Sequence, residues 1–413
     1  VSFFYEVVCM APSPYPSEKF RLGMLLGDTR YRSTTIQVFA FIVFVSVAFW
    51  LVDNTAKNLA ALGKEIDFSY LSARAGYDIN QRLIHYTNDS THARAALVGI
   101  LNTLLVAFFG CFIATILGLF IGILRLSNNW IIAKLTSVYI EGFRNIPVLL
   151  WIVMFFAFLT EMTPAPKAFK GADPTSTMVF FDSIAITNRG TYFPMPIFGT
   201  GSIYVILTFV LSLVGIVMFL VYARNLQRQS GKILPRFLIS FLILCLPSVV
   251  VYFLSGTPVS LEYPYLKGFN FKDGVHVRNS FLALTLALGV YTSAYIAELV
   301  RSGIQAIHKG QTEAASALGL RPNRVMNLII LPQAIRVIVP PTISQFLNIT
   351  KNSSLAIAVG YMDVRSTLGG ITLNQTGREM ESMLLLMVFY LIVSLGISSV
   401  IQGFNRAFEI KER

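Results

Sequence analysis

The chain has 413 residues, of which 54% are hydrophobic and 13% are charged, about half the charged fraction of an average soluble domain. The apolar residues are concentrated in blocks of roughly 20 residues, the length of a helix that crosses a bilayer. These properties exclude a soluble enzyme, a secreted disulfide scaffold and a disordered chain, and they indicate an all-α, polytopic membrane protein. The net charge of +12 then indicates Lys and Arg retained on the cytoplasmic side rather than a nucleic-acid partner.

Eight transmembrane helices are predicted, at 34–52, 96–124, 137–160, 200–223, 237–255, 279–300, 337–359 and 382–405. The first could be mistaken for a signal peptide, but it is longer than the usual apolar core of a signal, so we interpret it as an anchor. With the N-terminus inside, the inside segments hold 18 Lys and Arg in 102 residues, and the outside segments hold 13 in 127. The positive-inside rule therefore predicts that both termini are cytoplasmic.

Catalytic and metal-binding patterns are absent from the sequence. The three cysteines are scattered and the four histidines do not cluster, so we predict no metal site and interpret the thiols as buried. No nucleophile–base set can be assembled, and we predict that the chain is not an enzyme. There is no phosphate-binding Gly-rich loop, and the largest inside segment, 301–336, is too short for a nucleotide-binding domain. If ATP drives this protein, another chain hydrolyses it, and this chain needs no cofactor.

The segment 301–336 has the pattern of two short helices joined by a sharp bend. Thr312 is an acceptable N-cap, and Glu313 would then lie at the positive end of the helix dipole. Gly319 supplies a left-handed stop, and Pro322 fits the first turn of a second helix that ends near Leu331-Pro332. The residues alone leave open whether this segment docks on another protein or lies on lipid headgroups as an amphipathic loop.

This segment resembles the EAA signature of ATP-binding cassette importer permeases. In that signature Glu-Ala-Ala is followed after three residues by Gly, after nine more by Ile, and after one more by Leu-Pro. Every spacing is kept here, in Glu313-Ala314-Ala315, Gly319, Ile329 and Leu331-Pro332. In that family the segment is the coupling helix, which docks in a groove of the ATPase subunit, so the resemblance implies that Glu313, Ala314, Ala315 and Gly319 couple this chain to an ATPase.

Other stretches are similar to permeases for polar amino acids. The longer general L-amino-acid type, and its relative for glutamate, glutamine, aspartate and asparagine, resemble this chain most. At Trp151 the chain departs from the polar subfamily, which usually has Gln there, and this puts a polar role at that position in doubt. The stretches that carry the resemblance are Leu101–Leu104, Phe143-Arg144-Asn145-Ile146-Pro147, Tyr295–Arg301, Gly76–Gln81 and Lys351-Asn352-Ser353-Ser354.

The resemblance implies the domain organisation and the partners. Residues 1–95 would form an N-terminal tail, the first span and a periplasmic segment; 96–405 would form the permease domain, with a type-I importer core and an insertion at about 161–278; 406–413 would be a cytoplasmic tail. The partners implied are a dimer of ATPase subunits, a second permease subunit, a periplasmic amino-acid-binding protein and the bilayer of the bacterial inner membrane. ATP would be used by the ATPase subunits.

Ionisable residues inside predicted spans are costly and often mark a pathway. Glu298 and Arg301 are three residues apart, and we interpret them as a structural pair. For Glu141 and Arg144, the sequence leaves open whether they form a structural ion pair or take part in function. Lys351 lies among polar residues that line a water-filled cavity, form an interface between two permeases, or make a polar contact between helices. The substrate-pathway candidates are Lys351, Asn348, Asn352, Ser353, Ser354 and Arg144.

The sequence therefore predicts the permease subunit of an ATP-driven importer that carries L-amino acids, polar ones in particular, across the inner membrane. The alternative is a secondary amino-acid transporter driven by an ion gradient, which should show two related halves with interrupted spans. A membrane-embedded enzyme would need a convergent set of catalytic groups. Neither pattern is visible in the sequence.

Overall fold

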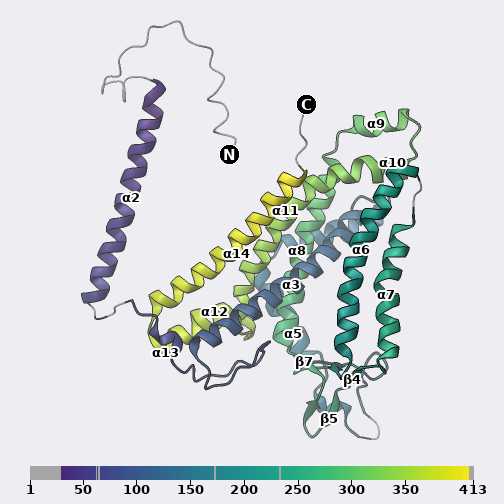
Figure 1. Cartoon of the computed structure of the whole chain (residues 1–413). Helices are drawn as coiled ribbons and strands as arrows, with labels where there is room; N and C mark the ends of the chain where they lie inside the picture. Colours follow the sequence, from purple (N-terminus) through teal and green to yellow (C-terminus); the bar gives the residue numbers. More distant parts are fainter. Residues whose placement is uncertain (1–28, 62, 64–65, 172–173, 232–233, 409–413) are drawn as a thin grey trace. The chain divides into compact units, whose positions relative to one another are not determined.

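The computed structural model describes residues 29–61, 63, 66–171, 174–231 and 234–408, and it consists of two units, 1–68 and 69–413. The described part of the first unit is dominated by one helix, α2 (Thr29–Ala61; Figure 1). Lys57 pairs with Asp53 one turn earlier at 2.6 Å. Residues 1–28, which include most of the predicted N-terminal tail, and residues 409–413 of the predicted tail 406–413 lie outside the described residues.

The second unit is built mainly from helices. The longer ones are α3 (His92–Leu124), α4 (Trp130–Asn145), α5 (Val148–Glu161), α6 (Ser202–Ser230), α7 (Arg236–Leu254), α8 (Asn279–Gln305), α11 (Leu331–Asn352) and α14 (Glu379–Phe408). The shorter ones are η2 (Ser69–Ser72), η3 (Pro166–Phe169), α9 (Lys309–Ala317), α10 (Pro322–Val325), the π-helix η4 (Met326–Ile330), η5 (Ser353–Val359), α12 (Val364–Ser366), the π-helix η6 (Thr367–Thr372) and α13 (Leu373–Thr376). Together with α2, the described residues contain seven helices long and apolar enough to span a membrane, or eight if the bent pair α4–α5 is one span. This confirms the predicted polytopic helical fold.

The predicted span 137–160 is not one straight helix. α4 and α5 meet at an angle of 105°. Ile146 is extended, with φ −104° and ψ 134°, because Pro147 disfavours a helical conformation in the residue before it and donates no amide hydrogen bond. Across the bend the Phe143 ring stacks on Trp151, with 4.1 Å between their centroids. The residue that departs from the family pattern therefore serves here to pack one half of the bent pair against the other.

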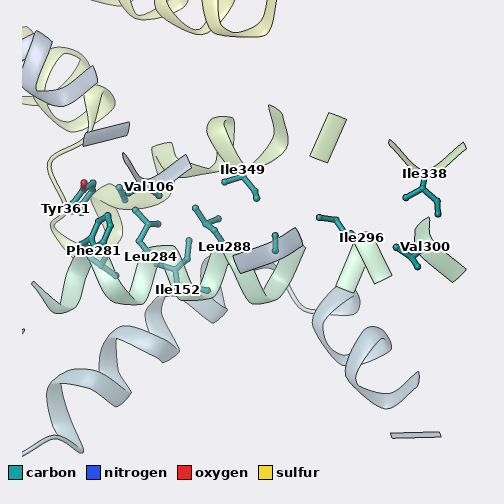
Figure 2. Close-up of a cluster of buried hydrophobic side chains, with 14 of the residues drawn as sticks. Val106, Ile152, Phe281, Leu284, Leu288, Ile296, Val300, Ile338, Ile349 and Tyr361 are labelled. Carbon is teal, nitrogen blue, oxygen red and sulfur yellow. The ribbon is translucent and has the colours of Figure 1, made fainter. Parts of the chain in front are cut away.

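The hydrophobic core surrounds α8, which packs against α3, α5, α4 and α11. Leu284 and Leu288 of α8 lie close to Ile152 of α5 and Ile349 of α11 (Figure 2). Further along the same core, glycines of α3 allow the two helices to approach closely. A Cβ atom added at Gly118 would lie 2.6 Å from Ile296, and one at Gly122 would lie 2.7 Å from Val300.

α6 and α7 form a hairpin that packs mainly on itself (Figure 1). Short strands, which the sequence analysis does not predict, flank it: β1 (Ala185–Thr187), β2 (Gly190–Phe193), β3 (Met195–Phe198), β4 (Val259–Glu262), β5 (Tyr265–Lys267), β6 (Asn270–Lys272) and β7 (Val275–Val277). β3 leads into α6, β4 follows α7, and the two strands pair antiparallel, which closes the hairpin at its base. The others form the antiparallel sheet β1-β2-β7 and the pair β5–β6.

The segment from η2 to the start of α3 contacts η6 and α14 through polar side chains. Tyr77 Oη and His92 Nδ1 lie 3.1 Å and 3.0 Å from Thr372 Oγ1, and Tyr70 Oη lies 3.2 Å from Ser382 Oγ. These hydroxyl and imidazole contacts replace water for groups that are buried between the two segments.

Candidate functional site

In the segment 301–336, which we call the coupling segment after the family that it resembles, a short helix, α9, lies between α8 and α11. α9 begins at the N-cap His308, whose Nδ1 accepts a hydrogen bond from the Gly310 amide at 3.1 Å. The prediction of Thr312 as N-cap is wrong, because the helix begins one turn earlier, at Lys309. Glu313 consequently lies in the middle of α9 rather than in its first turn, and the favourable dipole interaction predicted for it is wrong as well.

The end of α9 is a Schellman motif centred on Gly319. The Leu320 amide donates to the Ala315 carbonyl at 3.2 Å, and the Gly319 amide donates to the Ser316 carbonyl at 2.9 Å. Gly319 has a φ of 76°, so the predicted left-handed stop is confirmed. The side chain of Ala315 is buried, whereas Glu313 and Ala314 are exposed. α9 therefore leaves Glu313 and Ala314 accessible on its outer surface.

The sequence predicts that the helix after the bend ends near Leu331-Pro332, and this prediction is wrong. Pro322 does open α10 in its first turn, but α10 passes through η4 into α11. Pro332 has no amide hydrogen, and the chain accommodates it with one wide turn in which the Leu331 amide donates to the Met326 carbonyl. The coupling segment is thereby joined to α11 by continuous helical structure.

Lys351 lies at the far end of α11, one residue before that helix ends. The predicted span 337–359 is α-helical only as far as Asn352, and Ser353–Val359 form the 3-10 helix η5. Thr350 and Ser353 are buried, and their hydroxyls donate to the carbonyls of Phe346 and Thr350 at 2.9 Å and 2.7 Å. Two of the polar residues that surround Lys351 therefore have hydrogen-bond partners in the backbone of their own segment.

A cavity of about 890 Å³ opens beside α14, and Lys351 and Ser354 both line it. Arg365 of α12 lies on the same cavity, and so does Tyr390 of α14. The opposite wall is apolar and rich in methionine, with Met380, Met383, Leu384, Met387, Val388 and Leu391 of α14. Neither Lys351 nor Arg365 forms an ion pair with another residue in the part of the chain that the structure describes. Both cations are thus available to an anionic group that enters the cavity.

The other pathway candidates are separate from this cavity. The exposed Asn348 amide donates to Gln345 Oε1 at 3.2 Å, and Asn352 is half-buried; neither lines the cavity. Arg144 lies over the ring of Tyr295, with 5.2 Å between its Cζ and the ring centroid. The structure brings Lys351 and Ser354 together and leaves Asn348, Asn352, Ser353 and Arg144 elsewhere.

Glu141 and Arg144 have different partners rather than one another. Glu141 Oε1 accepts from Ser137 Oγ at 2.8 Å, whereas Arg144 contacts Tyr295. The Glu298–Arg301 pair, in contrast, is formed, with 3.0 Å between Arg301 Nε and Glu298 Oε2. The spacing of three residues is the same in both cases, so spacing alone does not determine whether an ion pair forms.

Sequence analysis missed a buried polar group behind the cavity. Asp363 is fully buried and caps α12, and its Oδ1 accepts from the Ser366 amide at 2.8 Å. Burial raises the pKa of this carboxyl, and the hydrogen bonds from Ser366 oppose the rise. Its Oδ2 has no hydrogen-bond partner among the described residues. An Asp immediately before a short helix is an N-cap pattern that could have been found; the role of Arg365 had no signal beyond its charge.

Comparison with known proteins identifies the family of this chain. Residues 225–412 match the family described as binding-protein-dependent transport system inner membrane component. Over 98% of its length the chain is 50% identical to the whole of a glutamate/glutamine/aspartate/asparagine transport system permease protein of Rhodobacter capsulatus. The chain belongs to this family of ABC amino-acid permeases.

Two further relatives extend over nearly the whole permease. A general L-amino acid transport system permease protein of Rhizobium johnstonii is 42% identical over 99% of this chain and 100% of its own length. A putative amino-acid ABC transporter permease protein of Escherichia coli is 42% identical over 95% of this chain and 98% of its own. The permease is accordingly a multi-pass inner-membrane subunit of an ATP-driven amino-acid importer, and its family works with ATPase and binding-protein partners.

Proposed function

We propose that this permease carries polar L-amino acids through the membrane, and that α9 is the element through which a separate ATPase drives it. Two permease subunits, two ATPase subunits and one periplasmic binding protein would form the working importer. The relatives named for glutamate, glutamine, aspartate and asparagine, and for L-amino acids in general, support this substrate class. The chain itself would bind and release substrate and do no covalent chemistry, and it would need no cofactor of its own.

The observation that carries the proposal is the position of α9. Its exposed Glu313 and Ala314 lie on the connection between α8 and α11, the two core helices that pack on one another. α11 is about 30 Å long, since it has 22 residues at about 1.5 Å each. A displacement of α9 is thereby transmitted along α11 to Lys351, at the opposite end of that helix.

The cavity of Lys351, Ser354 and Arg365 supplies a place for the substrate carboxylate. Lipid offers no hydrogen-bond partner to a charged group, so a zwitterion must be met by protein groups on its path. The methionines of the opposite wall are flexible and polarisable, which suits side chains of different shape. An amino acid held by its carboxylate against such a wall would be recognised by class rather than by one side chain.

Uptake measurements test this proposal. Cells with and without the gene are given a panel of labelled amino acids, and the purified permease is examined for a co-purifying ATPase. Uptake of polar amino acids that depends on the gene, together with an associated ATPase, is expected. Uptake that continues after ATP depletion and collapses with the ion gradient would instead establish a secondary transporter.

The role of Lys351 is tested by Lys351→Ala. We expect at least a tenfold loss of uptake per assembled complex, because the carboxylate loses a charge-assisted partner of roughly 1.5–3 kcal/mol. Ser344→Ala is the matched control, since Ser344 is exposed on the same helix and lies outside the cavity. If Lys351→Ala lowers only the amount of complex and leaves uptake per complex unchanged, Lys351 is structural.

The proposed orientation places both termini in the cytoplasm. Reporter fusions after residues 75, 180, 265 and 370 should report the periplasm, and those after 130, 230 and 413 the cytoplasm. A periplasmic reporter at the C-terminus would contradict the orientation.

A further inference from the structure

The α6–α7 hairpin is surrounded by little protein. No side chain of α7 is buried, and α6 buries only Ser212 and Ala223. Among the described elements the two helices pack substantially only on each other. The other described helices of the second unit therefore leave most of this hairpin uncovered, so that lipid or another molecule can surround it along its length.

One end of the hairpin concentrates positive charge. Arg224 and Arg228 are exposed one turn apart on α6, and Arg236 opens α7 on the other side of the connecting loop. The Arg236 guanidinium donates to the Gln227 side chain, which brings the cation of α7 beside those of α6. We call these three arginines the basic end of the hairpin.

No acidic residue balances this charge. The sequence contains no Asp or Glu between Asp182 and Glu262, and none of the three arginines forms an ion pair with any residue that the structure describes. Like charges one turn apart on a helix destabilise it by a few tenths of a kcal/mol. The C-terminal dipole of α6 compensates for this at Arg228, which lies in the last turn, but Arg224 lies further from the helix end.

Large apolar side chains adjoin the arginines on the membrane side. Met218, Val221 and Tyr222 precede Arg224 on α6, and their exposed fractions are 68%, 52% and 59%. Phe237 and Leu238 follow Arg236 on α7 and are 87% and 56% exposed. Cations at the edge of an exposed apolar face match an anionic headgroup joined to acyl chains, whereas a free phosphate ion would leave that face uncovered.

We propose that the basic end of the hairpin binds the headgroup of an anionic phospholipid, and that the acyl chains lie along the exposed faces of α6 and α7. Arginine suits this task because its planar guanidinium binds phosphate oxygens in pairs. The lipid completes the solvation of a hairpin that the described part of the chain leaves uncovered. The positive-inside rule alone would require only that the loop be basic, not that it prefer one lipid.

Site-directed quenching by brominated lipids tests the proposal. The full permease, with Tyr222→Trp introduced beside the basic end, is reconstituted in vesicles of phosphatidylcholine and phosphatidylglycerol in equal parts. Either lipid carries bromine on its acyl chains, and the fluorescence of the parent protein is subtracted. Tyr204→Trp is the matched control, because Tyr204 is exposed to a similar extent, 62%, near the opposite end of α6.

The expected result is stronger quenching of the indole at position 222 by brominated phosphatidylglycerol than by brominated phosphatidylcholine, with no such preference at position 204. Each basic residue contributes roughly 1 kcal/mol to attraction of anionic lipid, so Arg224→Gln or Arg228→Gln should each lower the preference by up to about fivefold. The matched substitutions Lys267→Gln and Lys272→Gln, which remove exposed cations from β5 and β6, should leave it unchanged. Equal quenching by the two lipids at position 222, or a preference that survives loss of the arginines, would overturn the proposal.

Discussion

In α8, 72% of the most apolar stretch is buried against other parts of the chain, whereas the share is 6% in α6 and none in α7. The buried helix is nevertheless the least apolar of the three. α8 carries polar residues that find partners inside: the Asn279 side chain donates to the Leu159 carbonyl at 3.0 Å, and Ser293 Oγ donates to the Val290 carbonyl at 2.7 Å. In a membrane, extreme hydropathy marks the helices that face lipid, and small and polar residues mark those that face protein.

The backbones of α3 and α8 also approach each other more closely than those of α6 and α7. At Gly118 and Gly122 the backbone of α3 leaves no room for a side chain beside α8. At Gly215 of α6 the nearest atom to an added Cβ is Ile243 of α7, at an ordinary distance of 3.4 Å. The α3–α8 contact depends on glycine, and the α6–α7 contact does not.

The largest effect is therefore expected from Gly122→Val. The new side chain overlaps Val300 and the Ala297 carbonyl, and overpacking of this kind costs roughly 1–3 kcal/mol or more. We expect a large loss of folded permease, measured as the monodisperse yield in mild detergent and the midpoint of thermal unfolding. Gly215→Val in the hairpin is the control and should change both little. Equal losses from the two variants would show that the hairpin is as tightly packed as the core.

A smaller effect on stability but a large one on transport is expected at the coupling segment. An added Cβ at Gly319 has no atom within 4 Å, so the main cost of Gly319→Val is the strain of a positive φ, roughly 1 kcal/mol. That strain disrupts the Schellman stop and tilts α9. Uptake should be lost while the protein still reaches the membrane.

Gly319→Asn is the control for the coupling prediction, because Asn tolerates the left-handed conformation and should retain most of the uptake. Glu313→Lys, which reverses a charge on the exposed face of α9, should weaken association with the ATPase. Normal transport in both Gly319→Val and Glu313→Lys would contradict the coupling role.

The sequence predicted those features that depend on local pattern. The apolar blocks predict the spans, and the spacing from Glu313 to Pro332 predicts the place of the coupling helix and the left-handed Gly319. The sequence analysis does not predict the sharp bend at Ile146-Pro147, because the apolar pattern continues without a break across these residues. The bend is indicated only by the preference of the residue before a proline for an extended conformation.

Features that depend on contacts between distant segments could be predicted less well from the sequence. Lys351 was found as a charge inside a span, and Ser354 by helical spacing. Arg365 joins their cavity only because η5 and the turn after it fold back, which no local pattern encodes. The short strands are also set by pairing: β2 pairs with β7, although more than 80 residues separate them in the chain. Neither strand is long or alternating enough to be predicted alone.

The smallest expected effect concerns Asp363 and comes from its protonation. Burial raises the pKa of this carboxyl, so the folded state disfavours its charged form. Stability is then greatest below the ordinary carboxyl pKa of about 4 and declines as the pH rises through the raised pKa of the folded state. The hydroxyl groups of Tyr361 and Tyr390 are near enough to be affected by a charge on Asp363, and neither can supply a positive charge that would stabilise the carboxylate.

Asp363→Asn keeps the N-cap, because the Asn side chain can also accept from the Ser366 amide, and it removes the charge. We expect the variant and the parent to unfold at similar temperatures in acidic buffer, and the variant to unfold at a slightly higher temperature in neutral and alkaline buffer. Asp363→Ala separates the two contributions: it removes the charge and the cap together, and loss of a cap costs about 1 kcal/mol at every pH. If the parent gained stability relative to Asp363→Asn as the pH rose, the carboxylate would be stabilised by a cation, and Arg365 would have to turn from the cavity toward it.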